Sequence, residues 1–305
     1  MTEVEKLVRD KIRGIENTPV QFMTRAAKVQ QSLLEEVLGL MGKLDTKNGE
    51  ILLTAKNVRL LEQISTKIKS VLSGTEYLGA VKQFSKSLVT QQQITRKLFE
   101  KSFGEGDFGA VTDMLMKQSQ KTMTLELVGE SVSSSVVKPI DTILQSAVSS
   151  GATTKETIKS VTEAIMGNKS KLGALESHAG QIVYDSFANA DRAYTSLLAT
   201  EIGADWFMYA GGAIKSSRAF CIDRAGQYFH RKEIEAWGAG DVTEGISRPT
   251  ETSKNWQGKN TNTNSATIFV YAGGYNCQHA IIPVPVSQVP KRVIERNIAS
   301  GNISD

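Results

Sequence analysis

Cysteine and histidine are scarce in this 305-residue chain, which contains two cysteines and three histidines. Two cysteines are too few for the disulfide framework that stabilises small secreted domains. No apolar run approaches the roughly 20 residues that a membrane-spanning helix requires, so we expect no membrane segment. The net charge of +4 is mild and is spread along the chain without a basic run. This charge is compatible with DNA contact but does not indicate it.

The composition is otherwise that of an ordinary globular protein. Apolar residues make up 40% of the chain and charged residues 22%, which argues against wholesale disorder. The first residues, Met1 to Glu5, are polar and acidic and lead into no apolar stretch. We therefore expect no signal peptide, and synthesis and folding in a cytoplasm. The Gly-Gly pairs at 211–212 and 273–274 lack the helix and lysine that a phosphate-binding loop requires.

The character of the sequence changes near residue 203. All three tryptophans and four of the six prolines follow that point, and eleven of the twenty aromatic residues lie between Trp206 and Tyr275. We therefore predict an α+β protein, in which a long N-terminal α-helical region is followed by a small C-terminal α+β module. The expected segments are helix hairpins or a bundle at 1–170, a long connecting helix at 171–203, the compact module at 204–292 and a C-terminal tail at 293–305.

Apolar residues at helical spacing mark the N-terminal helices. Leu34 and Val37 belong to one apolar face, and Ile64 and Ile68 belong to another. The polar stretch at 45–50 between them contains an Asn-Gly step, which predicts a turn and an antiparallel helical hairpin. Further helices are predicted at 77–103, from 110 to the serine-rich stretch 131–135 with a break or restart at Pro139, at 154–166 with a capping box that starts at Thr153, and at 171–202.

The C-terminal part predicts shorter elements. Aromatic and β-branched runs at 205–210 and 267–272 suit strands, and each run is followed by Gly-Gly. The other expected elements are a short helix at 231–237, a long exposed loop at 241–265, an extended segment at 281–286 and a frayed end at 300–305.

Two blocks of the C-terminal part carry a recognisable pattern. The first, at 217–237, contains an Arg-x-x-Cys segment followed by a glycine and an aromatic-Phe pair. The second, at 273–284, contains an Asn-Cys-Gln-His step that leads into Pro-Val. Together they resemble the C-terminal module of the phage Mu F-like minor head proteins, the phage head morphogenesis family. The residues of the pattern, besides the cysteines and the histidine, are Arg218, Phe220, Gly226, Phe229, Trp237, Gly273, Gly274, Asn276 and Pro283.

The resemblance covers residues 185–290, including the end of a long helix through Arg192. Two positions depart from the family pattern: Gln278 stands where arginine is commonest, and Arg224 stands where some relatives have a second cysteine. The resemblance implies a non-catalytic virion protein, made in the host cytoplasm, that acts in head assembly inside or at the portal vertex of the head. Its implied partners are the portal or major capsid protein, with self-association as a further contact.

Cys221, His230, Cys277 and His279 suggest a metal site, because thiolate and imidazole are the usual ligands of zinc. Their spacing is not that of a standard zinc finger. A disulfide between the two cysteines is a second reading, which a reducing cytoplasm disfavours. A third reading is two buried reduced thiols that pack as small apolar groups, with His279 hydrogen-bonded to the backbone. Structural zinc, a disulfide and reduced packing all stay open from the sequence.

Catalysis is the least favoured function. Cys277 with His279, or Cys221 with His230, supplies a thiol and an imidazole, but the sequence places no oriented third group beside either pair. A zinc-dependent nuclease is the catalytic alternative, because Asn276 and His279 look superficially nuclease-like. The main alternative to a minor head protein is an internal virion protein that is packaged with the genome and ejected with it. A toxin-associated effector domain is a further hypothesis.

Overall fold

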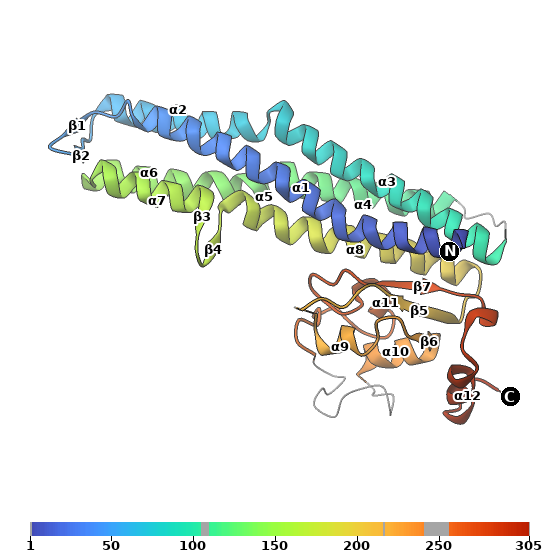
Figure 1. The fold of residues 1–305 in the computed structure, drawn as a ribbon. Coiled ribbons are helices and arrows are strands. Elements are labelled where there is room, and N and C mark those ends of the chain that lie inside the picture. Colours follow the sequence, from blue (N-terminus) through green and yellow to red (C-terminus); the bar gives the residue numbers. More distant parts are fainter. Residues whose placement is uncertain (1, 105–109, 216, 241–255, 305) are drawn as a thin grey trace. The chain divides into compact units, whose positions relative to one another are not determined.

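The computed structural model describes residues 2–104, 110–215, 217–240 and 256–304. It confirms the predicted α+β class, since a long N-terminal helical region precedes a small module with a three-stranded sheet (Figure 1). Within these described ranges, no helix combines the length and the hydropathy needed to cross a membrane.

Two compact units divide the chain, and each is assembled from segments that are distant in sequence. The bundle unit comprises residues 19–86 and 121–183. The sheet unit comprises residues 1–18, 87–120 and 184–305. These units differ from the consecutive segments that we expected. The reason is that four long helices, α1, α3, α4 and α8, each contribute residues to both units.

Every helix that the apolar spacing predicts in the first two thirds of the chain is present. The prediction of one helix from 110 to the serine-rich stretch is wrong in detail, because α4 ends earlier and the chain continues through α5 and a π-helical turn, η1. Pro139 lies in the first turn of α6, directly after η1, at the predicted restart. The helices are α1 (Glu3–Met41), α2 (Ala55–Leu72), α3 (Thr75–Phe103), α4 (Ala110–Val128), α5 (Glu130–Val132), η1 (Ser133–Val137), α6 (Lys138–Ser150), α7 (Thr154–Met166) and α8 (Ala174–Glu201).

Two short hairpins connect helices of the bundle unit. Strands β1 (Thr46–Lys47) and β2 (Glu50–Ile51) confirm the predicted turn, whose central residues Asn48 and Gly49 adopt φ of 54° and 84°. Positive φ at both positions is what a two-residue hairpin turn requires. Strands β3 (Gly167–Asn168) and β4 (Lys171–Leu172) form the second hairpin, so α8 begins at Ala174 and not at the predicted residue 171.

Aromatic packing and a helix cap illustrate how the bundle unit is held. Phe22 of α1 packs on Tyr77 and Phe84 of α3, with ring centroids 6.3 Å and 5.2 Å apart. The predicted N-cap of α7 is confirmed, because the backbone N–H of Glu156 donates to the Thr153 hydroxyl at 3.2 Å. The reciprocal half of the predicted capping box differs, since the Glu156 carboxylate accepts from the Thr153 hydroxyl at 2.7 Å. A cap of this kind stabilises a helix by about 1 kcal/mol.

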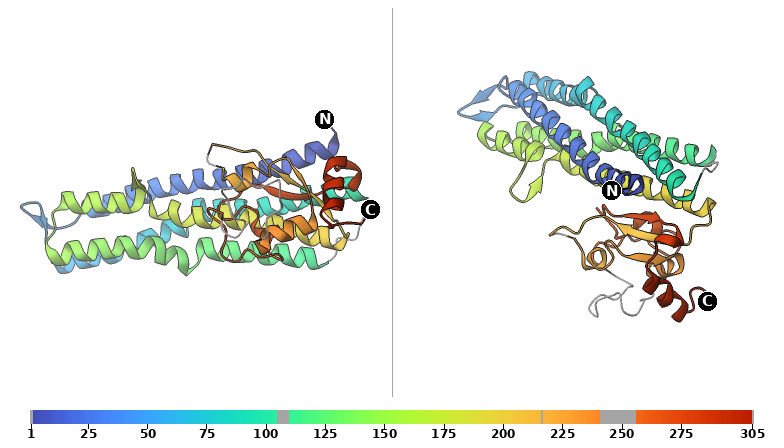
Figure 2. Two further views of the ribbon diagram at one scale, coloured as in Figure 1. Left: turned by 90° about the horizontal axis from the view of Figure 1, so that it is seen from below. Right: turned by 45° about the vertical axis from the view of Figure 1, so that its right-hand side comes forward.

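The sheet of the C-terminal module is antiparallel, with β5 at its centre in the order β6-β5-β7 (Figure 1). Figure 2 shows the module, in orange and red, from two further sides. Phe207 of β5 is paired with Phe229 of β6 and with Pro283 of β7. Because β6 lies within the first block and β7 lies within the second, one strand joins both motif blocks. The elements are β5 (Trp206–Ala210), α9 (Ala219–Ile222), β6 (Tyr228–His230), α10 (Arg231–Ala239), α11 (Ile268–Tyr271), β7 (Ala280–Pro283), the 3-10 turn η2 (Val286–Gln288) and α12 (Lys291–Ala299).

The strand predicted at 267–272 is wrong, because this segment forms the short helix α11. Backbone N–H groups of Thr267 and Ile268 donate to the carbonyl of Asn264, which starts a helical turn. Phe269 then packs against Phe207 of β5 with centroids 5.1 Å apart. The aromatic run is therefore helical, with Ile268 and Phe269 buried. The other predicted elements, the strand at 205–210, the helix at 231–237 and the extended segment at 281–286, are confirmed within a few residues.

The end of the chain is more ordered than the predicted tail. Residues 291–299 form α12, whose Arg296 makes a 2.9 Å ion pair with the buried Glu233 of α10. Asn297 also donates to the Glu233 carboxylate at 2.9 Å, and its backbone carbonyl accepts from the N–H of Asn302. These contacts order residues that we expected to fray. Of the long loop predicted at 241–265, residues 241–255 lie outside the described residues, and Trp256 is buried.

Candidate metal centre

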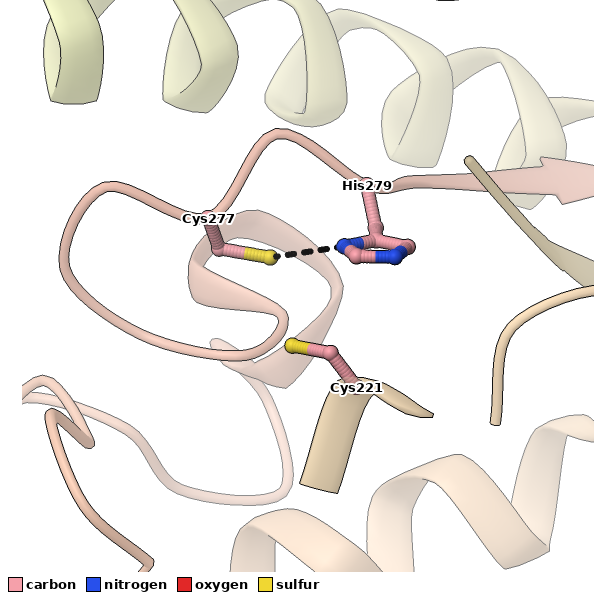
Figure 3. Close-up of side chains that lie close together, drawn as sticks. All are labelled: Cys221, Cys277 and His279. Carbon is pink, nitrogen blue, oxygen red and sulfur yellow. Dashed lines mark hydrogen bonds between the residues drawn. The ribbon is translucent and has the colours of Figure 1, made fainter. Parts of the chain in front are cut away.

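Three of the four predicted metal ligands lie together in the core of the C-terminal module. Cys221 is on α9, and Cys277 and His279 are on the segment that leads into β7 (Figure 3). One ligand atom from each of the three side chains lies within 4.8 Å of the others, and all three residues are buried. The two motif blocks therefore meet at this cluster.

Tyr209 of the central strand β5 is a fourth member of the cluster. Its hydroxyl lies 3.5 Å from the sulfur atoms of both Cys221 and Cys277, and its ring stacks on His279 with centroids 5.0 Å apart. The Cys277 sulfur lies 3.8 Å from Nδ1 of His279. The sequence places Tyr209 on a strand but does not predict this contact. Alternation along a strand shows which side chains share a face of the sheet, and not which residues pack against that face.

One glycine of each Gly-Gly pair borders the cluster, which gives that glycine a physical role. A Cβ at Gly273 would lie 2.4 Å from the Cys221 sulfur and 3.0 Å from the Cys277 sulfur. A Cβ at Gly211, where φ is 135°, would lie 2.8 Å from the imidazole of His279. The glycines thus allow backbone to approach sulfur and imidazole closely.

Arg192 of α8 holds the segment that carries two of the three side chains. Its buried guanidinium donates to the backbone carbonyls of Cys277 and His279, each at 2.9 Å, and also to the carbonyl of Val270. The N–H of Asn276 donates to the carboxylate of Asp185, also on α8, at 2.6 Å. These charge-assisted bonds fix the loop against the helix. The sequence marked Arg192 only as part of a long helix.

The two thiols have opposite acidities because they share a hydrogen bond. The hydrogen bond with Cys221 lowers the pKa of the Cys277 thiol well below its usual range, against the effect of burial, and His279 and Arg192 lower it further. The same hydrogen bond and burial raise the pKa of Cys221. Burial also raises the pKa of Tyr209 well above 10.0. The Cys277 thiol is therefore the more acidic of the two.

His230 is not a member of this group. It is the N-cap residue of α10, where its Nδ1 accepts the backbone N–H of Lys232 at 3.3 Å. Its own backbone N–H donates to the Glu233 carboxylate at 2.8 Å, which completes a capping box. The ring also meets the edge of Trp206, with centroids 5.0 Å apart. The sequence could not distinguish a capping histidine from a ligand.

The remaining residues of the motif pattern build the module's core. Phe220, Phe229 and Trp237 pack edge to face, with centroids 5.9 Å apart for the first and third and 4.6 Å for the second and third. Arg224, which replaces a cysteine of some relatives, lies over the ring of Phe220 at 3.9 Å. Arg218 donates to the carbonyls of Gly273 and Tyr275, which connects the first block to the second. Gly226 and Gly274 have positive φ in turns, and Pro283 is paired within the sheet.

The geometry favours structural over nucleophilic chemistry. Cys221 is 2% exposed and Cys277 is 3% exposed, so a substrate has no direct approach to either sulfur. Two sulfurs and an imidazole at these distances can bind a soft cation, form a disulfide or pack as reduced thiols. Comparison of the chain with protein-family models, with curated proteins and with solved structures gives no match.

Proposed function

We propose that this chain is a non-catalytic assembly protein of a tailed bacteriophage, a minor head protein that acts at or near the portal or the inner capsid surface. The observation that carries the proposal is the pair of blocks at 217–237 and 273–284, which resembles the phage Mu F-like minor head proteins. Support comes from the way both blocks pack around β5, as parts of one module would.

The roles of the pattern residues are consistent with a structural module. Phe220, Phe229 and Trp237 form aromatic core, Gly273 permits a close approach to sulfur, and Arg218 connects the blocks. Each of these roles explains why the pattern needs that residue type without invoking a substrate. The proposal accordingly assigns no catalytic residue to the chain.

Partner binding is assigned to the helical part of the chain. The pattern residues of the module pack within the module's own core. The N-terminal helices carry none of the pattern residues, so their exposed faces are assigned to partner binding. Long helices are suited to packing against other chains because an exposed helical face can extend an existing core. The expected partners are the portal protein or the major capsid protein.

Quantitative mass spectrometry of assembly intermediates and of purified particles tests the proposal. We expect the chain in both, in a fixed ratio to the portal protein, and we expect particles made without its gene to be defective or misassembled. Absence of the chain from intermediates and from mature particles alike would exclude the proposal.

Analysis of particles that have been triggered to release their DNA distinguishes this proposal from the main alternative, an internal protein ejected with the genome. A head component that acts in assembly stays with the emptied capsid, whereas an internal protein ejected with the genome leaves it. Binding of the purified chain to duplex DNA at increasing salt adds a second criterion, because phosphate contacts weaken steeply as salt rises.

A further inference from the structure

The convergence of Cys221, Cys277 and His279 has the chemistry of a metal site. We propose that these three side chains bind one zinc ion through two sulfur atoms and one imidazole nitrogen, and that the site is structural. Thiolate and imidazole together select zinc-class ions over magnesium or calcium, which prefer oxygen ligands. The inference is independent of any role in a virion, because it depends only on the geometry of the module.

The distances in the cluster are close to those of a tetrahedral zinc site. Zinc–sulfur and zinc–nitrogen bonds of about 2.3 and 2.0 Å place neighbouring ligand atoms about 3.5 to 3.8 Å apart. The Cys277 sulfur and Nδ1 of His279 are 3.8 Å apart, and the Cys221 sulfur lies within 4.8 Å of a ligand atom of each of these two residues. Binding an ion therefore requires only small movements of side chains that already face one another (Figure 3).

The two ring nitrogens of His279 make few hydrogen bonds for a buried imidazole. Among the described residues, the sulfur of Cys277 is the only hydrogen-bond partner of its ring, and Nε2 is buried without a partner. Buried polar groups are nearly always hydrogen-bonded, commonly to backbone. Reduced packing predicts a backbone partner for this ring, and the cluster does not provide one. A metal ligand role explains why the ring is turned toward sulfur.

The surroundings hold the ligands in position before an ion binds. Arg192 fixes the backbone of Cys277 and His279 through their carbonyls. Gly273 and Gly211 leave room at the sulfurs and at the imidazole, where any side chain would intrude. Preorganised ligands and a supporting outer shell are features of protein metal sites. An ion here would link α9 to the start of β7, which connects the two motif blocks.

Native mass spectrometry of the full chain, purified with zinc and under reducing conditions, tests the proposal. We expect the mass of one bound zinc ion per chain, and we expect Co(II) to replace zinc with the visible absorption of tetrahedral sulfur coordination. His279→Asn and Cys277→Ser should each lose the stoichiometric ion. His230→Asn is the matched control, because it makes the same substitution at a histidine outside the cluster and keeps a good helix cap.

Each result decides between the alternatives. An unmodified mass with no ion overturns the proposal. Purification repeated without reductant then separates a disulfide, which makes the chain lighter by two hydrogens, from reduced packing, which leaves the mass unchanged. Retention of the ion by His279→Asn, or its loss from His230→Asn, overturns the ligand assignment. Should Cys277→Ser fail to fold, the Co(II) spectrum of the unaltered chain and the stoichiometry of His279→Asn still decide.

Tyr209 is assigned as a positioning residue whose hydroxyl donates its one proton to either of the two ligand sulfurs, each 3.5 Å from the oxygen. Tyr209→Phe should keep the ion but weaken its binding by about tenfold or more, the effect expected for an outer-shell partner. The Co(II) charge-transfer bands should also shift, because the sulfurs lose a hydrogen-bond donor. Unchanged affinity and spectrum would remove this role from Tyr209, since a purely packing ring would leave both unchanged.

Discussion

At the residue scale, the most consequential polar group outside the cluster is Lys11 of α1. Its side chain is fully buried and lies 2.5 Å from the carboxylate of Asp191 on α8. The hydroxyls of Thr95 and Thr195 accept two further bonds from its ammonium, at 2.7 Å and 3.0 Å. Burial lowers the pKa of Lys11 and Asp191 opposes that effect. The pair therefore fixes how α1 and α8 pack within the sheet unit, because burying either charge without the other is strongly destabilising.

Asp191→Asn should reduce the free energy of unfolding by about 3 to 5 kcal/mol, since it leaves a buried ammonium without its counter-ion. Urea denaturation followed by circular dichroism measures the loss. The double substitution Lys11→Met with Asp191→Leu should recover most of it, because both buried charges are removed. A single variant as stable as the unaltered protein would show that the ion pair does not exist in the folded chain.

Gly273→Ala should destabilise the sheet unit by about 1 to 3 kcal/mol, as expected when a methyl group is forced into filled space. The new Cβ would meet the sulfurs of Cys221 and Cys277 at 2.4 Å and 3.0 Å. Gly212→Ala is the control, because a Cβ there meets nothing within 4 Å. Thermal unfolding should separate the two variants, and equal melting temperatures would contradict the close approach at residue 273.

At the scale of elements, helices were easier to predict than short strands. The period of apolar residues marks a long helix over many turns, which is why α3, α7 and α8 begin and end within a few residues of the predicted 77–103, 154–166 and 171–202. No ends were predicted for α1 and α2. The run at 267–272 offers only six residues, too few to show a period. The segment is helical because the backbone carbonyl of Asn264 accepts the first helical hydrogen bonds, from the N–H groups of Thr267 and Ile268. In α12, order comes from the distant Glu233, which no local pattern reveals.

The start of α10 gives a pH-dependent prediction. The Nδ1 of His230 must be unprotonated to accept the Lys232 N–H, and burial lowers the pKa of His230 below 6.5. A folded-state pKa below the unfolded value means that the stability is complete above pH 6.5 and is lost as the pH falls through the folded-state pKa.

Unfolding free energies measured in urea at pH 7.5 and pH 5 test this contribution. The unaltered chain should lose more stability between these pH values than His230→Asn does, because asparagine caps the helix without titrating. The pKa of His178 is also lowered, chiefly by burial, so His178→Gln provides a separate comparison. Equal pH dependence of the unaltered chain and His230→Asn would contradict a titrating cap.

At the scale of the whole molecule, the sequence predicts which residues form the site but not how the fold arranges them or which residues surround them. The sequence grouped Cys221, Cys277 and His279 by their chemistry, and the fold brings them together. It wrongly grouped His230 with them, because a capping role depends on where a helix begins. Arg192 could not be assigned, since its carbonyl partners come from residues far along the chain.

The discontinuous sheet unit predicts that the C-terminal module depends on α8. A fragment of residues 204–305 lacks Arg192 and Asp185, which hold the loop of the cluster. We expect it to give a poorly dispersed amide NMR spectrum. A longer fragment, 184–305, restores both side chains and should be better dispersed. A well-folded short fragment would show that the module is an autonomous domain.

The central position of β5 has a consequence for finding related chains. Its two edges pair separately with β6 and β7, so the pairing fixes residues within each motif block. Hydrogen bonding across a sheet does not fix how many residues separate two strands that never pair with each other. A search pattern should therefore hold the spacing inside each block constant and let the interval between blocks vary freely in length.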